Sequence, residues 1–213
     1  CIRDRSRYIG PKCRQCRREG MKLFLKGTRC ETVKCAIAKR AHPPGDHPWA
    51  RKKRSEYGVQ LREKQKAKRT FGIFERPFRK LFAEAARSKG NTGESLIQIL
   101  ERRLDNALYL SGLAHSRAHA RQLITHGHVH VNTRGTKSPG FRLRQGDTFG
   151  VRPQKEHIKK HVEATIEGTK HRDVPSWLSQ DAKELNAKVL SLPKRDEASV
   201  DLQEQLIVEF CSK

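Results

Sequence analysis

The spacing of apolar residues changes from a helical to a strand period part-way along this chain, and that change limits the folds available to it. Between residues 71 and 108 apolar side chains recur every three or four positions, as on one face of a helix. At Val129 to Val131, and again at Phe149 to Val151, they occupy every second position, as in strands with one buried face. We therefore expect a mainly α protein with a small β part.

The predicted helices are short, and glycine or proline separates them. Ser116 suits the N-cap of one helix, because a serine hydroxyl can accept a hydrogen bond from a backbone N–H of the first turn. Residues 202–210 could form a last helix or a strand, and the capping-box pattern of Asp201 and Glu204 favours the helix. Helices are predicted over residues 75–88, 94–110, 116–126, 156–164, 182–190 and 202–210, and short strands near residues 129–131, 141–143 and 149–151.

Composition divides the chain into three predicted parts. Residues 1–45 are basic, contain cysteine and lack apolar periodicity, and the proline-rich run over residues 42–48 indicates a linker. Residues 46–101 are expected to form a helical domain that residues 164–213 complete. Residues 102–163, in which helix, turn, helix and short strands follow in order, are expected to form a module inserted into that domain.

Four of the six cysteines have the spacing C-x2-C-x13-C-x4-C: Cys13, Cys16, Cys30 and Cys35. Four thiolates without histidine predict a closed tetrahedral zinc site, with an iron–sulfur cluster as the alternative and four reduced, unligated thiols as the simpler interpretation. A bound metal would fold a segment that has too few apolar residues to fold unaided. Basic neighbours would favour the thiolate form; they are Lys12, Arg14, Arg17, Arg18 and Arg29.

The chain is strongly basic, with 46 Lys and Arg against 23 Asp and Glu and a net charge of +23. The first ninety residues carry +19 of this charge, from 27 basic and 8 acidic residues. Solubility alone needs a net charge of only about 2 to 8 in a small domain. The excess predicts a polyanionic partner, nucleic acid above all, bound with a steep salt dependence. No apolar run is long enough to span a membrane, and no signal peptide is visible, so no membrane association is expected.

The predicted helix after Ser116 carries Arg117 and Arg121 on one face. Its N-terminus offers unpaired amides and the positive end of a dipole, which suit a phosphate. His126, His128 and Asn132 follow in the adjoining turn and strand, and Arg103 lies on the preceding helix. These residues predict a small basic patch that fits folded RNA, although a solvated charged helix face would show the same pattern.

Several segments resemble the family of small-subunit ribosomal protein number four. Within the predicted module the resemblance lies in residues 101–106, 116–123, 127–132 and 146–147. Outside it, the similar segments are residues 7–13, 17–20, 43–45, 57–66, 89–94, 175–178 and 204–210, so the resemblance covers essentially the whole chain. Residues 46–49 and 133–140 depart from the family pattern.

The resemblance implies an N-terminal metal knuckle of the zinc-bearing type, a helical domain and an inserted RNA-binding module of the alpha-L type. It implies direct binding to small-subunit rRNA at a helix junction in the five-prime domain, where the family nucleates assembly of the subunit body. It also implies contact with ribosomal proteins five and three, a part in translational accuracy, and contact with mRNA where it enters the subunit. The expected location is the cytoplasmic ribosome, with an organellar ribosome left open.

Charge and resemblance together predict a long set of RNA-binding residues. They are Arg3, Arg5, Arg7, Tyr8, Lys12, Arg14, Arg17, Arg18, Lys22, Lys26, Arg51, Lys52, Lys53, Arg54, Tyr57, Gln60, Arg62, Lys64, Lys66, Arg69, Arg103, Ser116, Arg117, Arg121, His126, His128 and Asn132.

Two other classes of protein share parts of this pattern. An rRNA pseudouridine synthase carries the tripeptide Arg103-Leu104-Asp105 around its catalytic Asp, but here the tripeptide lies within the predicted module and no room remains for a catalytic domain. A DNA-binding regulator could use the helix pair, but strands directly follow it and the charge is spread over ninety residues. His115 and His119 flank a predicted helix cap with no Glu between them, which argues against a zinc-protease pair. No catalytic activity and no small-molecule substrate are expected.

Overall fold

The computed structural model describes residues 8–47, 55–152, 156–181 and 184–212. The chain divides into two compact units: a first unit of residues 1–96 and 200–213, and a second unit of residues 97–199. This differs from the predicted division, because residues 164–199 belong with the inserted module and only the last fourteen or so residues return to the first unit.

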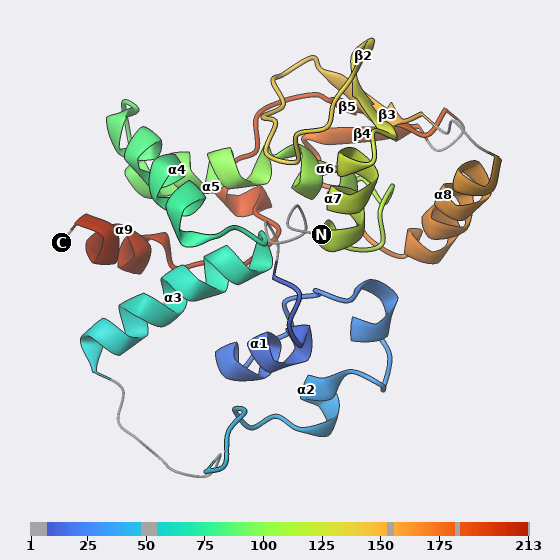
Figure 1. The fold of residues 1–213 in the computed structure, drawn as a ribbon. Coiled ribbons are helices and arrows are strands. Elements are labelled where there is room, and N and C mark those ends of the chain that lie inside the picture. Colours follow the sequence, from blue (N-terminus) through green and yellow to red (C-terminus); the bar gives the residue numbers. More distant parts are fainter. Residues whose placement is uncertain (1–7, 48–54, 153–155, 182–183, 213) are drawn as a thin grey trace. The chain divides into compact units, whose positions relative to one another are not determined.

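The first unit is helical. It contains α1 (Lys12–Glu19), the 3-10 turn η2 (Gly27–Cys30), α2 (Ala36–Lys39), α3 (Glu56–Thr70), α4 (Glu75–Arg87) and α9 (Glu204–Ser212), and α5 (Thr92–Glu101) crosses from it into the second unit. The α3 and α9 helices pack side by side, as Figure 1 shows. Ser55 begins α3, because its hydroxyl accepts a hydrogen bond from the Gly58 N–H at 3.2 Å. The α4 helix buries Phe78, Leu81 and Ala85, which lie three and four positions apart.

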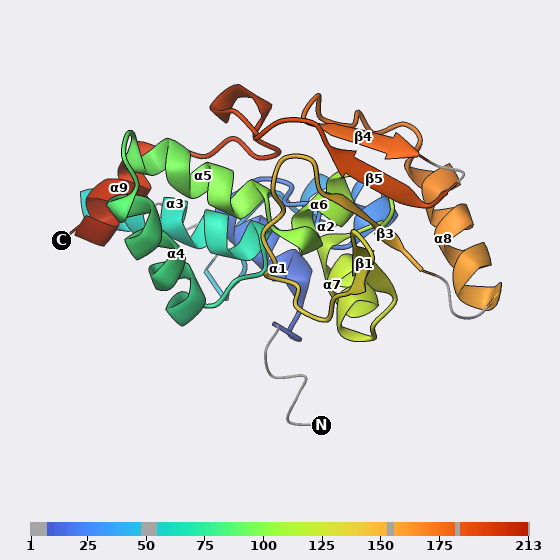
Figure 2. The ribbon, with the colours of Figure 1, turned by 90° about the horizontal axis from the view of Figure 1, so that it is seen from above.

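The second unit packs helices against one antiparallel sheet. Its helices are α6 (Leu104–Leu110), α7 (Arg117–Thr125) and α8 (Glu156–Thr169). Its strands are β1 (Val129–Val131), β2 (Arg134–Gly135), β3 (Thr148–Val151), β4 (Leu178–Asp181) and β5 (Asn186–Val189), in the order β2-β1-β3-β5-β4, and the short 3-10 turn η3 (Arg195–Glu197) follows them. Figure 2 shows this sheet from above. Val129 faces Val151, and Phe149 faces Ala187.

One apolar core joins the sheet of the second unit to its three helices. Leu104 and Leu108 of α6, and Ile124 of α7, are fully buried in it. Val162 of α8 and Trp177, just before β4, complete the same cluster and are equally inaccessible. This core includes side chains from both sides of residue 164. The segment after α8 is therefore needed to complete the core and supplies the strands β4 and β5.

The predicted fold class is confirmed in its main features, since the chain is mainly helical with a small antiparallel sheet. The helices expected over residues 75–88, 116–126 and 202–210 are present, as are the strands at 129–131 and 149–151. Near residues 141–143 the structure has an isolated bridge between Arg103 and Arg142 in place of a strand.

Two predicted helices were wrong. The helix expected over residues 94–110 is broken, because the backbone of Arg103 is extended and the N–H groups of Leu104 and Asp105 donate to the carbonyls of Phe141 and Pro139. The helix expected over residues 182–190 is replaced by β5. There Leu185, Ala187 and Val189 are buried at every second position, which is the period of a strand. Within the described residues no helix is both long and apolar enough to cross a bilayer.

Candidate RNA-binding surface and cysteine pocket

The four spaced cysteines line one pocket of the first unit. Cys13 and Cys16 come from α1, Cys30 ends η2, and Cys35 precedes α2, while Lys12, Lys26 and Arg29 lie at the rim. Cys16, Cys30 and Cys35 are buried, and Cys13 is half-buried. The pocket therefore brings together the ligand set that the spacing predicted, from three separate short helices.

Backbone amides point at two of these sulfurs. The Lys26 N–H donates to Cys30 Sγ at 3.3 Å, and a backbone hydrogen bond from Leu23 reaches Cys16. Burial raises the pKa of both thiols, and these hydrogen bonds work in the opposite direction by favouring the thiolate. Among the described residues, the four sulfur atoms do not gather within 4.8 Å of one another as a ligand group. A single ion at the pocket would draw them closer together.

Basic side chains around α1 form the exposed part of the first unit's predicted RNA surface. Arg14, Arg18, Lys22 and Lys26 are exposed, Lys12 is half-buried, and Tyr8 is 44% exposed. Arg17 has a structural role as well, since its guanidinium donates to the carbonyls of His42 and Pro43. It thereby anchors the proline-rich segment to α1.

The basic residues of α3 are largely engaged with partners inside the first unit. Gln60 is 1% exposed and donates to Glu209 at 3.0 Å, and Lys64 is 4% exposed and forms an ion pair with Glu75 at 2.8 Å. The Lys64 ammonium also lies 4.5 Å from the centroid of the Phe210 ring. The α3–α9 packing thus uses two residues that were predicted to bind RNA.

The neighbouring residues of α3 show the same tendency. Arg62 and Arg69 both reach Glu19, and Lys66 pairs with Glu63 at 2.6 Å. Tyr57 stays 59% exposed while its ring packs against the ring of Phe210. Of the predicted α3 set, Tyr57 is the residue that presents most of its surface to solvent.

In the second unit, Ser116 caps α7 as predicted. Its hydroxyl accepts from the His119 N–H at 3.2 Å, and the residue is 4% exposed, so the hydroxyl serves the helix. Arg117 donates to Asn106 Oδ1 at 2.7 Å and to Ser199 Oγ at 2.9 Å, and it lies over the Tyr109 ring. Burial lowers the pKa of Arg117. Its guanidinium holds α7 to α6.

Arg103 is an interior residue. It is 6% exposed, and its Nε and Nη2 atoms donate to the two oxygens of Asp105 at 3.1 and 2.8 Å. Arg121 approaches the same carboxylate at 3.8 Å and stays partly exposed. The structure therefore engages Arg103 in a two-pronged pair with Asp105 at the break between α5 and α6.

Three arginines that flank this break form a positively charged cluster. Arg102 follows α5, and Arg142 and Arg144 lie in the segment that pairs with it. Burial and the charges of Arg142 and Arg144 lower the pKa of Arg102, with Asp147 opposing them. A phosphate group would relieve this repulsion. Sequence reasoning missed Arg142 and Arg144, because only the bridge to Arg103 brings them beside Arg102.

The turn after β1 is held by Asn132. Its backbone is left-handed, with φ of 55°, and its side chain donates to Asp147 at 3.1 Å and accepts from the Thr148 N–H at 3.0 Å. His126 is exposed, and the centroid of its ring lies 6.3 Å from the ring centroid of the half-buried His128. The histidines remain candidates for RNA contact, whereas Asn132 serves the turn.

Comparisons with known proteins identify the family. A family model described as Ribosomal protein S4/S9 N-terminal domain matches residues 7–101, and one described as S4 domain matches residues 102–149. A protein named small ribosomal subunit protein uS4 from Desulforamulus reducens is 50% identical over 208 residues, which is 98% of this chain and 100% of that protein. The chain belongs to the uS4 family. Relatives of the same length include uS4A of Symbiobacterium thermophilum, at 52% identity, and uS4 of Caldicellulosiruptor saccharolyticus, at 50%.

The residues matched by the two family models correspond to parts of the structure already described. The N-terminal match contains the cysteine pocket and α1 to α5. The S4-domain match contains α6, α7, β1 and the arginine cluster, and it ends within β3. The uS4 family is one of ribosomal structural proteins and not a class of enzymes.

Some predicted residues lie outside the described part of the uS4 chain. They are Arg3, Arg5, Arg7, Arg51, Lys52, Lys53 and Arg54.

Proposed function

We propose that this chain is the rRNA-binding uS4 constituent of a small ribosomal subunit. The family assignment over the whole chain supports the place in the subunit. The observation that carries RNA binding is the cluster of Arg102, Arg142 and Arg144, in which the charges of Arg142 and Arg144 act against that of Arg102 while Asp147 opposes them. We propose that these arginines and the exposed basic residues around α1 hold rRNA phosphates.

Salt dependence tests this role. The assay is filter binding to a fragment of small-subunit rRNA. Arg142→Ala with Arg144→Ala should weaken binding and reduce the slope of log K against log salt by about 1.5, because each phosphate contact contributes roughly 0.7 to 0.9 to that slope. A matched control removes two exposed lysines of α8, Lys159 and Lys160, each of which faces an acidic side chain four residues away. Equal losses in both double variants would contradict a specific role for the cluster.

We further propose that Cys13, Cys16, Cys30 and Cys35 bind one metal ion, with zinc as the first candidate and an iron–sulfur cluster as the alternative. The shared pocket, the N–H groups directed at two sulfurs and the basic rim fit a thiolate site. Elemental analysis of the purified chain should find zinc or iron, and Cys16→Ser with Cys30→Ser should lower the content by one metal centre per molecule. A full-length protein with neither zinc nor iron would refute the proposal.

The resemblance also supports finer proposals. These are nucleation of subunit assembly, contact with ribosomal proteins five and three, contact with mRNA where it enters the subunit, and a location on a cytoplasmic ribosome of bacterial type. Sedimentation of the tagged chain, followed by chemical crosslinking of isolated small subunits, tests them together. A tagged chain that stays at the top of the gradient would contradict the ribosomal location, and crosslinks that never include proteins five or three would contradict the partners.

A further inference from the structure

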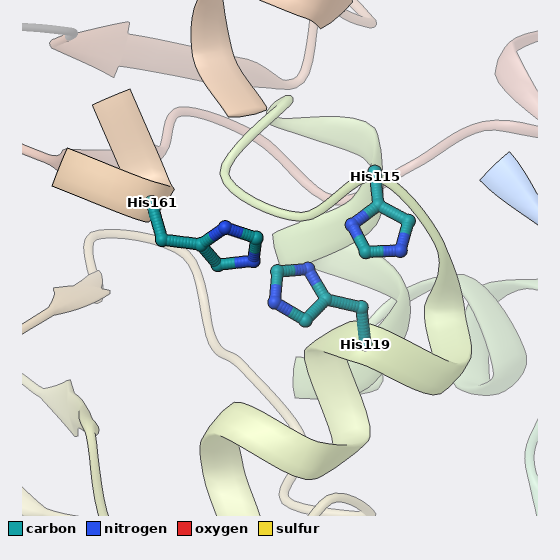
Figure 3. Close-up of side chains that lie close together, drawn as sticks. All are labelled: His115, His119 and His161. Atoms are coloured by element: carbon teal, nitrogen blue, oxygen red, sulfur yellow. The ribbon is translucent and has the colours of Figure 1, made fainter. Parts of the chain in front are cut away.

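Three histidines come together in the second unit without any role assigned so far. His115 follows α6, His119 lies on α7, and His161 lies on α8, and Figure 3 shows their rings directed toward a common point. The His115 and His119 rings stack with centroids 4.2 Å apart, and the His161 ring meets His119 edge-on at 5.2 Å. One potential ligand atom from each ring lies within 4.8 Å of the other two.

The central ring lacks a hydrogen-bond partner at one nitrogen. His119 Nδ1 is buried and has no hydrogen bond, which is a cost that folded proteins seldom leave uncompensated. An unprotonated imidazole carries a lone pair on one of its two nitrogens, which a metal ion can bind.

We propose that His115, His119 and His161 form a site for a divalent transition-metal ion, with zinc as its first occupant. Imidazole nitrogen is a ligand of choice for zinc, copper and nickel, whereas calcium and magnesium require oxygen ligands, which this group does not offer. The net charge of +23 disfavours any cation held by attraction alone, so an ion that forms directed bonds to nitrogen is the one that fits. The site lies in the second unit, apart from the cysteine pocket of the first.

The ligand nitrogens need to move only a short way, but the stacked rings of His115 and His119 must also turn, because an imidazole binds a metal ion through a lone pair in the plane of its ring. Zn–N bonds of about 2.1 Å in a tetrahedron place the ligand nitrogens roughly 3.4 Å apart. Closing from within 4.8 Å requires each ring to move by less than about 1 Å, which rotation of the side chains provides. His161 is exposed and able to turn, and His115 is held by Arg172, whose guanidinium donates to the His115 carbonyl at 3.4 Å.

A bound ion would link α8 to α7 and to the segment between α6 and α7. The ion would take three nitrogens and leave a fourth position to water or to an outside ligand. Because the ion binds only where the three rings are gathered, zinc should stabilise the folded second unit, and the stabilisation should rise with the logarithm of the zinc concentration above the dissociation constant. A stack of imidazoles that serves packing alone would not respond to zinc.

A zinc titration of the full chain carrying isotope-labelled histidine tests the proposal. The ring nitrogen resonances of all three histidines should move together on binding, and this readout is blind to zinc taken up by thiolates. His161→Asn should weaken the response by about 10-fold or more, since even loss of a residue that only supports a ligand costs 10- to 100-fold. The matched control is His171→Asn, an exposed histidine beyond the end of α8, which should bind zinc as the parent chain does.

Thermal unfolding provides a second measurement. In a Trp49→Phe background, where Trp177 is the one indole, zinc should raise the thermal midpoint of the second unit. The rise should appear with the three histidines intact and in His171→Asn, but not in His161→Asn. The proposal would be overturned if the histidine resonances did not move in excess zinc. It would also be overturned if His161→Asn and His171→Asn lost the zinc response equally.

Discussion

Asp105 offers the sharpest test of how the second unit is held together. Its carboxylate is buried at 2% exposure and accepts two hydrogen bonds from Arg103, itself 6% exposed. Asp105→Asn keeps the shape of the side chain but removes its charge. The Arg103 guanidinium would then remain in the interior without its counter-charge.

The expected cost follows from that burial. Removing one partner of a buried ion pair costs about 3–5 kcal/mol, because the remaining charge has lost its water and gained nothing in return. Arg121 lies 3.8 Å from the same carboxylate but is 21% exposed, so its share is below about 1 kcal/mol. We therefore expect Asp105→Asn to lower the unfolding free energy of the second unit by about 4 kcal/mol.

The assay uses urea unfolding with Trp177 as the reporter. Trp177 is fully buried in the core of the second unit, and the substitution Trp49→Phe leaves it as the one indole of the chain. With a slope of about 1.5 kcal/mol per molar urea, the midpoint should fall by roughly 2–3 M. Adding Arg103→Met to Asp105→Asn removes the stranded charge, so the double variant should recover at least about 2 kcal/mol of that loss.

Two outcomes would refute this reasoning. A midpoint for Asp105→Asn within experimental error of the parent would mean that the pair contributes nothing to stability. A double variant less stable than Asp105→Asn would mean that Arg103 stabilises the fold without its partner.

Three further predictions follow from the same structure. Ser116→Ala should cost about 1 kcal/mol in the same fluorescence assay, while Ser116→Gly should cost only a few tenths, because the hydroxyl caps α7. Phe78→Ala should lower the stability of the first unit by about 3–5 kcal/mol in far-ultraviolet circular dichroism, since Phe78 is fully buried. Burial opposes ionisation of Glu75, but Lys64, Lys68 and Arg79 outweigh it and lower its pKa from 4.5 to about 2. This carboxylate therefore stabilises the fold fully above pH 4.5 and loses that effect as the pH falls towards 2. Between these pH values the unfolding free energy of Glu75→Gln, measured by acid titration, should decline less steeply than that of the parent chain.

Local signals predicted most of the elements. The spacing of Phe78, Leu81 and Ala85 predicted α4, and the Ser116 hydroxyl predicted where α7 begins, since both depend on neighbours within one or two turns. The residues of β5 were misassigned, because a segment of eight or nine residues rich in Ala, Leu and Lys suits a helix equally well. Pairing with β3 and β4 made it a strand. The β4 strand comes just before it in the chain, but β3 lies much earlier, and the sequence gives no local signal of that pairing.

Which basic residues pair with carboxylates inside the protein was decided only by tertiary structure. The sequence determined by itself that the chain is basic, that four cysteines share a metal-like spacing, and that it resembles one ribosomal family. It did not determine that Lys64 meets Glu75 and Arg103 meets Asp105, or that Arg142 and Arg144 gather beside Arg102. A guanidinium or ammonium group binds a carboxylate as readily as a phosphate, so composition cannot assign it to either. Only the fold decides which anion reaches it, by bringing a carboxylate into the interior or leaving like charges together at the surface.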